Sequence, residues 1–200
     1  GIFQRAIAIL FIIVGLLVFT GYDKKLQTYV SEHTPFNFDA LSARLLPASK
    51  REVAPGVLNV VPYAAPEFVG LDGWINSDPL TMSQLKGKVV LVDFWTYSCI
   101  NCIRNNPYIE GWYQKYKDLG FTVVGSHAPE FAFEKVRANV QKAVIDQKLS
   151  YPIALDNELA TWNAFSNRSW PTAYLIDTEG NVRRVHEGEG EYAETEDAIR

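Results

Sequence analysis

Two apolar runs near the middle of the chain give its clearest secondary-structure signal. Residues 89–95, VVLVDFW, and residues 121–127, FTVVGSH, are almost continuously apolar and rich in valine. Runs of this kind are typical of strands buried on both faces of a sheet. Between them, apolar side chains recur at helical spacing until Gly120, which ends the predicted helix. The residues of this helical stripe are Ile109, Trp112, Tyr113, Tyr116 and Leu119.

The rest of the pattern continues to alternate between helix and strand. Residues 131–148 predict an amphipathic helix, residues 151–156 a short strand and residues 159–165 a short helix. Residues 172–188 indicate a hairpin, and residues 191–200 begin a helix with an acidic first turn, inside which the chain stops. The apolar face expected for the longest of these helices consists of Phe133, Val136, Val140, Ala143 and Val144. This order predicts an α/β fold, a mixed sheet with helices on both faces.

The N-terminal stretch is apolar without interruption. No charged side chain occurs from Ala6 to Tyr22, and a helix of that length spans roughly 25 Å, close to the ~30 Å hydrocarbon core of a bilayer. We therefore expect residues 1–24 to form one transmembrane anchor. A cleaved signal peptide is the main alternative, although no A-x-A-like site follows closely, and a buried helix of a soluble protein is another.

The anchor and the regular pattern are separated by a proline-containing stretch without a long period. We interpret residues 25–55 as an irregular connector and residues 56–200 as the folded domain, truncated at its C-terminal end. Because the chain also lacks an initiator Met, we expect it to be a piece of a longer protein.

Composition narrows the function classes. A net charge of −4 supplies no basic face to neutralise phosphates, so nucleic acid is not an expected partner. The 200 residues contain only two cysteines, Cys99 and Cys102, too few for a scaffold stapled by disulfides. Their CxxC spacing therefore favours chemistry over structure.

The cysteine pair lies between a predicted buried strand and a predicted helix. At a helix N-terminus, unpaired backbone N–H groups and the helix dipole favour the thiolate of Cys99, which is the attacking species in disulfide exchange. Cys102, one turn later, can attack the resulting mixed disulfide and release the product. Asp93, inside the apolar strand, is costly to bury unless it has a task, and a raised pKa would suit it to accept the Cys102 proton. A salt-bridged structural aspartate is the alternative.

Several motifs resemble the thioredoxin superfamily. The segment VDFWTYSCINC is similar to its signature, Pro107 matches the proline that kinks its active-site helix, and SWPTAYLID resembles the segment that carries its cis-proline. The resemblance implies a thioredoxin-like fold, a cis Pro171 facing the cysteines, and a Trp170 backbone that pairs with the substrate chain. It implies a protein-disulfide oxidoreductase. Nothing in the sequence suggests a bound organic cofactor, and we expect no metal site.

Within that superfamily, residues 66–200 are similar to the TlpA/ResA-like branch. The segments FWTYSCINCIR and HAPEFAFEK also resemble DipZ-type proteins, in which a CcdA-like membrane domain precedes a thioredoxin domain. This resemblance implies that residues 1–30 end such a membrane domain, which donates electrons to a membrane-anchored domain on the extracytoplasmic (periplasmic or cell-envelope) side. Disulfide-containing proteins are the expected substrates; a cytochrome precursor (cytochrome c biogenesis), a damaged disulfide and a peroxide-reducing partner all fit.

The residues between the cysteines bear on the direction of the reaction. Ile100 and Asn101 replace the Gly-Pro of thioredoxin, and no histidine is present there to stabilise the thiolate. A strong oxidant needs an unusually stable reduced form, so we expect a reductase or an isomerase.

Two other classes remain open. A copper- or metal-delivery protein of the Sco type would use the cysteines with a histidine, but Sco-type proteins have three residues between the cysteines, and His33, His127 and His186 form no HxxxH motif. A thiol peroxidase would fit the TxxC segment at Thr96, although Val92 stands where the peroxidase motif has proline.

Three more side chains are candidates for the substrate site. His127 and Glu130 leave the second buried strand at its carboxyl end, where sites gather on such sheets. They either line the groove near Cys99, or tune the pKa of Cys99, or belong to a solvated loop. Trp95 is next to the active-site turn and either contacts the pair or simply fills the core.

Overall fold

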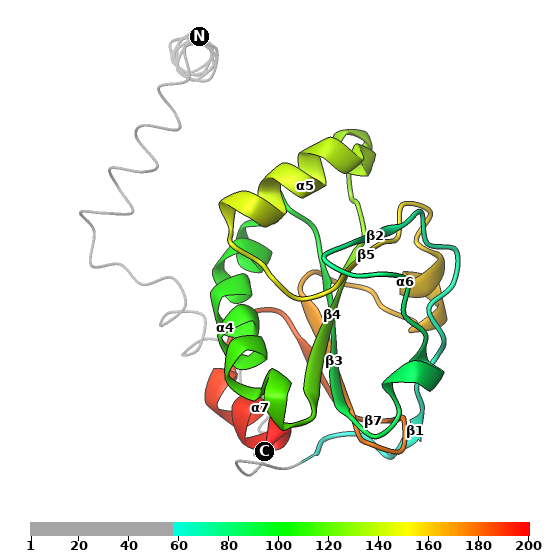
Figure 1. Cartoon of the computed structure of the whole chain (residues 1–200), viewed down its shortest axis with the longest axis vertical. Helices are drawn as coiled ribbons and strands as arrows, with labels where there is room; N and C mark the ends of the chain where they lie inside the picture. Colours follow the sequence, from blue (N-terminus) through cyan, green and yellow to red (C-terminus); the bar gives the residue numbers. More distant parts are fainter. Residues whose placement is uncertain (1–57) are drawn as a thin grey trace, which may run out of the picture. The chain divides into compact units, whose positions relative to one another are not determined.

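A seven-stranded mixed sheet organises residues 58–200, the part of the chain described in this computed structural model (Figure 1). The spatial order of its strands is β1-β7-β6-β3-β4-β5-β2. Their bounds are β1 Tyr63–Ala64, β2 Trp74–Ile75, β3 Val89–Trp95, β4 Phe121–His127, β5 Ile153–Leu155, β6 Thr172–Ile176 and β7 Asn181–Glu187. The two strands predicted from continuous apolar runs are β3 and β4, which pair in parallel at the centre. β6 pairs with the other edge of β3 in the antiparallel direction.

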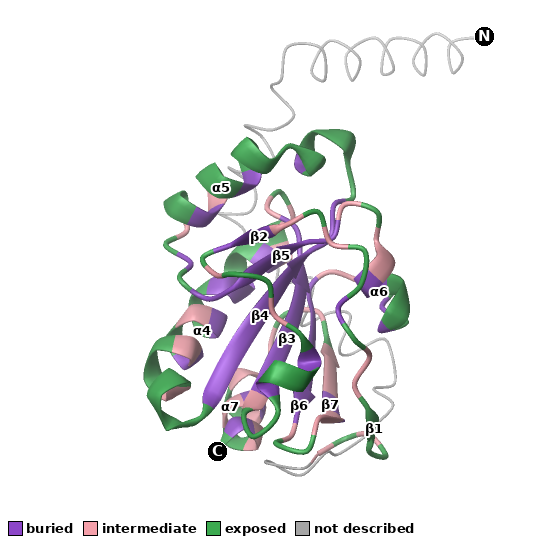
Figure 2. Ribbon diagram, turned by 45° about the vertical axis from the view of Figure 1, so that its right-hand side comes forward, coloured by how far each residue is buried: buried purple, intermediate pink, exposed green. Residues whose placement is uncertain are grey.

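Helices cover both faces of this sheet, as the sequence predicted (Figure 2). Buried side chains of α4, α5 and α7 pack on one face, and those of η1 and α6 on the other. The helical elements are η1 Met82–Leu85, α4 Ile100–Tyr116, η2 Lys117–Leu119, η3 Ala132–Lys135, α5 Arg137–Asp146, α6 Ala160–Ala164 and α7 Tyr192–Ile199. The mixed α/β architecture is confirmed.

The alternation of side chains along β3 divides them between the two faces. Leu91 and Trp95 belong to the cluster beneath α4, whereas Val90, Val92 and Phe94 belong to the cluster on the opposite face. Because successive strand residues point to opposite faces, Asp93 projects to the same side as Leu91 and Trp95. The alternation therefore places the Asp93 carboxyl group in the apolar layer under α4.

Helix α4 follows the predicted course. Pro107 lies within it and the helix continues to Tyr116, after which one turn of 3-10 helix leads to Gly120. Gly120 has φ +91°, a left-handed conformation that glycine adopts without steric cost.

The predicted helix over residues 131–148 is wrong in its first half. The segment divides into η3 and α5 at Val136, and Phe133 and Val136 are 51% and 49% exposed instead of buried. Val140 and Val144 are buried as predicted. The division arises because the Glu134 carboxylate turns back to accept hydrogen bonds from the backbone of the preceding loop, which fixes a short separate turn.

One edge of the sheet is closed by very little chain. β1 covers β7 at Asn181 and Val182 only. Further along β7, the Asn59 side chain donates to Val185 O (2.8 Å) and accepts from Val185 N (2.9 Å), while Asn59 N donates to Arg183 O (3.1 Å). The amide of one side chain thus takes the place of a neighbouring strand.

The predicted anchor, residues 1–24, and the predicted connector, residues 25–55, lie outside the described residues. Within residues 58–200, no helix has the length and apolar character needed to cross a bilayer.

Candidate active site

The cysteine pair lies where β3 gives way to α4. Cys99 is the N-cap of α4, and its Sγ accepts a hydrogen bond from the backbone N of Cys102 (3.3 Å). Both cysteines are free thiols; Cys99 is partly exposed and Cys102 has no exposed surface. An incoming disulfide can therefore reach Cys99 but not Cys102.

The buried thiol of Cys102 is held in its protonated form. Burial raises its pKa far above the ordinary value, and the neighbouring Cys99 and the charge of Asp93 raise it further. Since only a thiolate attacks a disulfide, Cys102 needs a base that removes its proton.

Asp93 is an ionisable group whose charge acts on the Cys102 thiol. It has no exposed surface, and neither carboxyl oxygen has a hydrogen-bond partner among the described residues. Burial raises its pKa to about 7. The salt-bridged structural aspartate, the alternative suggested by the sequence, is not what the structure contains.

Pro171 and Trp170 lie at the same end of the sheet. The Trp170–Pro171 peptide bond is cis, as the resemblance implies. Thr172, at the start of β6, pairs with Phe94, which places Pro171 beside the turn that follows β3. The indole of Trp170 donates a hydrogen bond to Ala128 O (2.9 Å) and packs on Trp162, so these two contacts fix the position of the ring.

His127 and Trp95 lie beneath the active-site turn and have no exposed surface. The His127 ring stacks on Tyr97, with 5.7 Å between centroids, and its Nε2 is 3.4 Å from Thr96 Oγ1. Burial lowers the pKa of His127 to about 4, which keeps the ring neutral near pH 7. Trp95 packs in the same core cluster as Cys102. The solvated-loop alternative for His127 is therefore wrong, and both side chains support the turn from within.

Comparison with known proteins places this arrangement in a family. The Redoxin family model matches residues 63–199. The chain belongs to the Redoxin family. It is 53% identical over 139 residues to Protein DipZ of Mycobacterium tuberculosis (strain CDC 1551 / Oshkosh), a match covering 68% of this chain and 20% of DipZ. It is 32% identical over 114 residues to the thiol-disulfide oxidoreductase ResA of Halalkalibacterium halodurans, covering 57% of this chain and 62% of ResA.

A solved structure supports the same conclusion. The solution structure of a thioredoxin-like protein in the oxidized form superposes with a TM-score of 0.64 and 27% identity, over 69% of this chain and 93% of that one. The thioredoxin-like fold and the assignment to thioredoxin-type thiol–disulfide oxidoreductases are confirmed. The chain spans about a fifth of the length of DipZ.

The redoxin domain also contains a site residue that the sequence analysis missed. Glu134 has no exposed surface, and its carboxylate accepts hydrogen bonds from Ser98 Oγ (2.6 Å), Glu130 N (2.7 Å) and Phe131 N (2.8 Å). Burial opposes the charge, but these hydrogen bonds keep the Glu134 pKa below its ordinary value. Because Ser98 precedes Cys99, the hydrogen bonds of Glu134 connect the loop after β4 to the active-site turn.

Glu130, the residue of this segment that the sequence predicted for the site, is exposed, and its backbone N–H donates a hydrogen bond to the Glu134 carboxylate. The available signal was the second glutamate of HAPEFAFEK, Glu134, which is absent from the apolar face predicted for residues 131–148.

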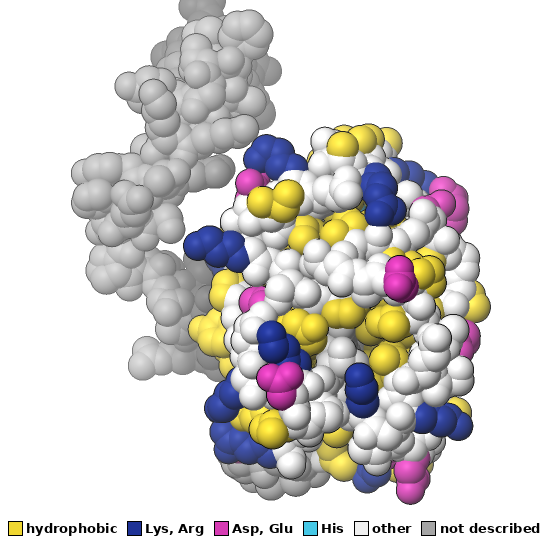
Figure 3. Space-filling view, in the orientation of Figure 1, with side chains coloured by type: hydrophobic (Ala, Val, Ile, Leu, Met, Phe, Trp, Pro, Cys, Tyr) yellow, Lys and Arg dark blue, Asp and Glu magenta, His cyan; other side chains and the backbone are white. Residues whose placement is uncertain are grey.

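The metal-ligating side chains of residues 58–200 do not gather into one cluster. No cluster of three or more His, Cys, Asp or Glu in this range could hold a metal ion. His33 lies outside it, and His186 Nδ1 is 3.2 Å from Glu191. On the face shown in Figure 3, positive and negative side chains are interspersed with apolar patches, so this face presents no continuous basic band.

Proposed function

We propose that this redoxin domain reduces or isomerises protein disulfides through Cys99 and Cys102. The observation that carries the proposal is the division of labour between the two thiols: Cys99 is accessible at the N-cap of α4, and Cys102 is buried on the side of the sheet to which Asp93 projects. The similarity to ResA, a thiol-disulfide oxidoreductase, supports the same chemistry.

The reaction begins when the Cys99 thiolate attacks one sulfur of a substrate disulfide. A Cys99–substrate disulfide forms, the substrate S–S bond breaks, and the departing sulfur takes up a proton. Cys102 then gives its proton to ionised Asp93 and attacks Cys99 Sγ, which releases the second substrate sulfur. The substrate gains two electrons and two protons, and the Cys99–Cys102 disulfide must be reduced again by an external dithiol.

The substrate chain runs past the cis Pro171 and pairs with the backbone of Trp170. Trp170 lies at the same end of the sheet as the active-site turn, which supports this role. Trp95 and His127 act from beneath, by packing against the turn rather than by contacting substrate.

Reduction or isomerisation is the direction that we propose, because Ile100 and Asn101 provide no histidine that would stabilise the reduced form of a strong oxidant. The electrons come from a CcdA-like membrane domain. The 53% identity to DipZ supports this source, and DipZ is about five times as long as the matched region.

We further propose that residues 1–24 anchor the protein in the membrane and residues 25–55 connect the anchor to a catalytic domain at 56–200. The uncharged stretch Ala6–Tyr22 supports the anchor. The catalytic domain then faces the extracytoplasmic side, where substrate disulfides persist.

Mixed-disulfide trapping tests this function. Cys102→Ser should accumulate covalent complexes with disulfide-containing proteins through Cys99, visible on non-reducing gels and lost with dithiothreitol. Cys99→Ser should accumulate none, because Cys102 is inaccessible. Equal trapping by both variants would refute the assigned roles, and absence of trapping by either would refute disulfide exchange.

A further inference from the structure

The tyrosine Tyr151 is a buried polar group that the proposed reaction does not yet use. It lies just before β5 with no exposed surface, and its hydroxyl has no hydrogen-bond partner among the described residues. The same is true of the Asp93 carboxyl oxygens and of Trp95 Nε1. Buried polar groups are normally paired, so the gathering of three such groups in one layer calls for a physical explanation.

Gly125 brings these groups together. It is the direct partner of Asp93 in the parallel pairing of β3 and β4. A Cβ at Gly125 would lie 2.8 Å from Tyr151 Cε2 and 3.0 Å from Trp95 Nε1. The Tyr151 ring therefore occupies the space of the missing side chain. Since paired strands are only about 4.8 Å apart, this space is adjacent to the Asp93 side chain on the same face.

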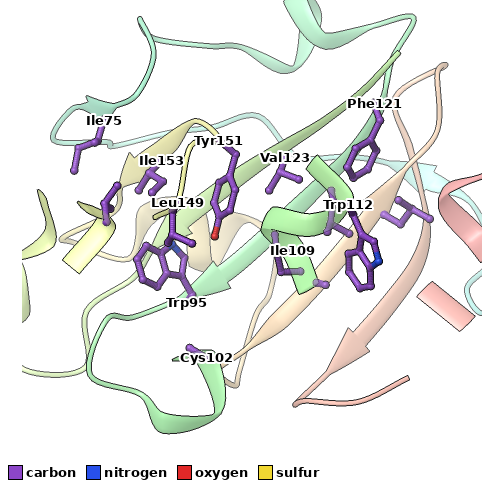
Figure 4. Packing of buried hydrophobic residues seen from close by; sticks show 14 of the residues in the cluster. Ile75, Trp95, Cys102, Ile109, Trp112, Phe121, Val123, Leu149, Tyr151 and Ile153 are labelled. Atoms are coloured by element: carbon purple, nitrogen blue, oxygen red, sulfur yellow. The ribbon is translucent and has the colours of Figure 1, made fainter. Parts of the chain in front are cut away.

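The orientation of Tyr151 agrees with this placement. Figure 4 shows its hydroxyl directed between Trp95 and Ile109, on the side of the sheet covered by α4. Asp93 projects to that side too. The phenol and the indole are thus two neutral donors on the same face of the sheet as the Asp93 carboxylate, and none of the three groups is paired within residues 58–200.

Few charged or titratable groups act on the Asp93 carboxylate. The Asp93 charge acts on Cys102 of α4 and on Tyr151 of the segment before β5, where burial raises the pKa of both groups and this charge raises it further. Glu110 of α4 also acts on Tyr151, but its carboxylate is occupied by Ser150 N (2.8 Å) and Ser150 Oγ (2.6 Å). On the flanking strands, the partners of Asp93 are Gly125 and Ala173, which carry no charge.

We propose that Tyr151 is a positioning residue that donates its hydroxyl hydrogen bond to ionised Asp93 and thereby sets the pH at which Asp93 accepts the Cys102 proton. This inference rests on the proposed disulfide exchange. No proton leaves Tyr151: burial and the Asp93 charge keep the phenol protonated, and its hydroxyl, unpaired among the described residues, moves into hydrogen-bond reach of the carboxylate when Asp93 ionises. The proton that moves goes from Cys102 Sγ to an Asp93 oxygen.

Two measurements on the reduced domain test the role of Tyr151. In protein labelled with 13C at aspartate carboxyls, Tyr151→Phe should raise the Asp93 titration midpoint by about one pH unit, because the charged form loses a donor. With 5,5′-dithiobis(2-nitrobenzoate), Cys99 releases the first thionitrobenzoate and Cys102 the second. The second phase should slow about fivefold at pH 7, where a smaller fraction of Asp93 is ionised, and recover at pH 9.

Matched variants separate this role from a structural one. Tyr113→Phe removes a hydroxyl from the ring that packs edge-on against Tyr151, with 6.1 Å between centroids, and should move neither reading. Introducing 3-fluorotyrosine in place of Tyr151 keeps the volume and strengthens the donor, so the midpoint should fall.

Three outcomes overturn the inference: an unchanged Asp93 midpoint in Tyr151→Phe, a second phase slowed equally at every pH, or a midpoint that does not fall with 3-fluorotyrosine. Absence of a second phase in the unsubstituted protein would instead refute the proposed function, while the aspartate titration would still decide the role of Tyr151.

Discussion

The buried carboxyl of Asp93 makes the stability of this domain depend on pH in an unusual direction. Its pKa is about 7 in the folded protein against an ordinary value of 3.8. Between these values the folded state retains a proton that the unfolded state has released, so the free energy of unfolding falls as the pH rises. The loss stops above pH 7, where both states are ionised.

The size of this effect follows from the difference in pKa. At about 1.36 kcal/mol per unit, a shift of roughly three units costs ~4 kcal/mol, of which about 3 kcal/mol is lost between pH 5 and pH 8. Asp93→Asn preserves the shape of the side chain but cannot titrate. The stability difference between the variant and the unsubstituted domain should therefore move by about 3 kcal/mol in favour of the variant over this range.

Urea unfolding followed by tryptophan fluorescence measures this difference at pH 5, 6, 7 and 8, with a phosphine reductant keeping both thiols free. Asp78→Asn, at an exposed aspartate, is the control and should show no such trend. If the Asp93→Asn difference moves by less than about 1 kcal/mol, Asp93 does not hold its proton in the folded state, and its role as base for Cys102 loses its foundation.

Three further predictions use the same unfolding assay. His127 is neutral in the folded state because its pKa there is about 4. As the pH falls from 6.5 to 4, the free energy of unfolding of the unsubstituted domain should therefore fall by about 3 kcal/mol relative to that of His127→Gln, the opposite pH trend to that of Asp93. A constant difference between the two proteins would contradict this. Glu134→Gln should lower the free energy of unfolding by about 2 kcal/mol at pH 7, whereas Glu130→Gln should change it by less than about 0.5 kcal/mol. Equal losses would show that the hydrogen bonds of the Glu134 carboxylate do not stabilise the loop. Gly125→Ala should cost about 1–3 kcal/mol because its Cβ would overlap the Tyr151 ring, unless the ring can move aside, which a neutral result would show.

The central part of the fold could be predicted from sequence because its signals are local. The runs at β3 and β4 are apolar throughout, and strands buried on both faces have that composition. The helical stripe ended where Gly120 adopts its left-handed conformation. Cys99 and Cys102 could be singled out because they are the only two cysteines of the chain and lie between these elements, and Asp93 because it is a carboxyl group inside an otherwise apolar strand.

The supporting residues of the site could not be predicted in this way because their contacts join distant segments. Glu134 meets Ser98 across 36 residues, and its spacing fits an exposed helical position equally well. Tyr151 gains its position from Gly125, whose missing side chain leaves space that no hydrophobic pattern reveals. The period also assigned Phe133 and Val136 to the core, although the turn fixed by Glu134 leaves both half exposed.

The closing of β7 by Asn59 has a consequence for how far the domain can be shortened. A row of unpaired backbone groups at a sheet edge is a template for another chain, and here one amide side chain and the two residues of β1 occupy that row. A version starting after residue 60 would keep its cysteines yet lose the Asn59 contacts, so that the backbone of Arg183 and Val185 becomes open to intermolecular pairing. The family match begins at residue 63, so β1 belongs to the matched region, whereas Asn59, which covers the rest of this edge, lies before it.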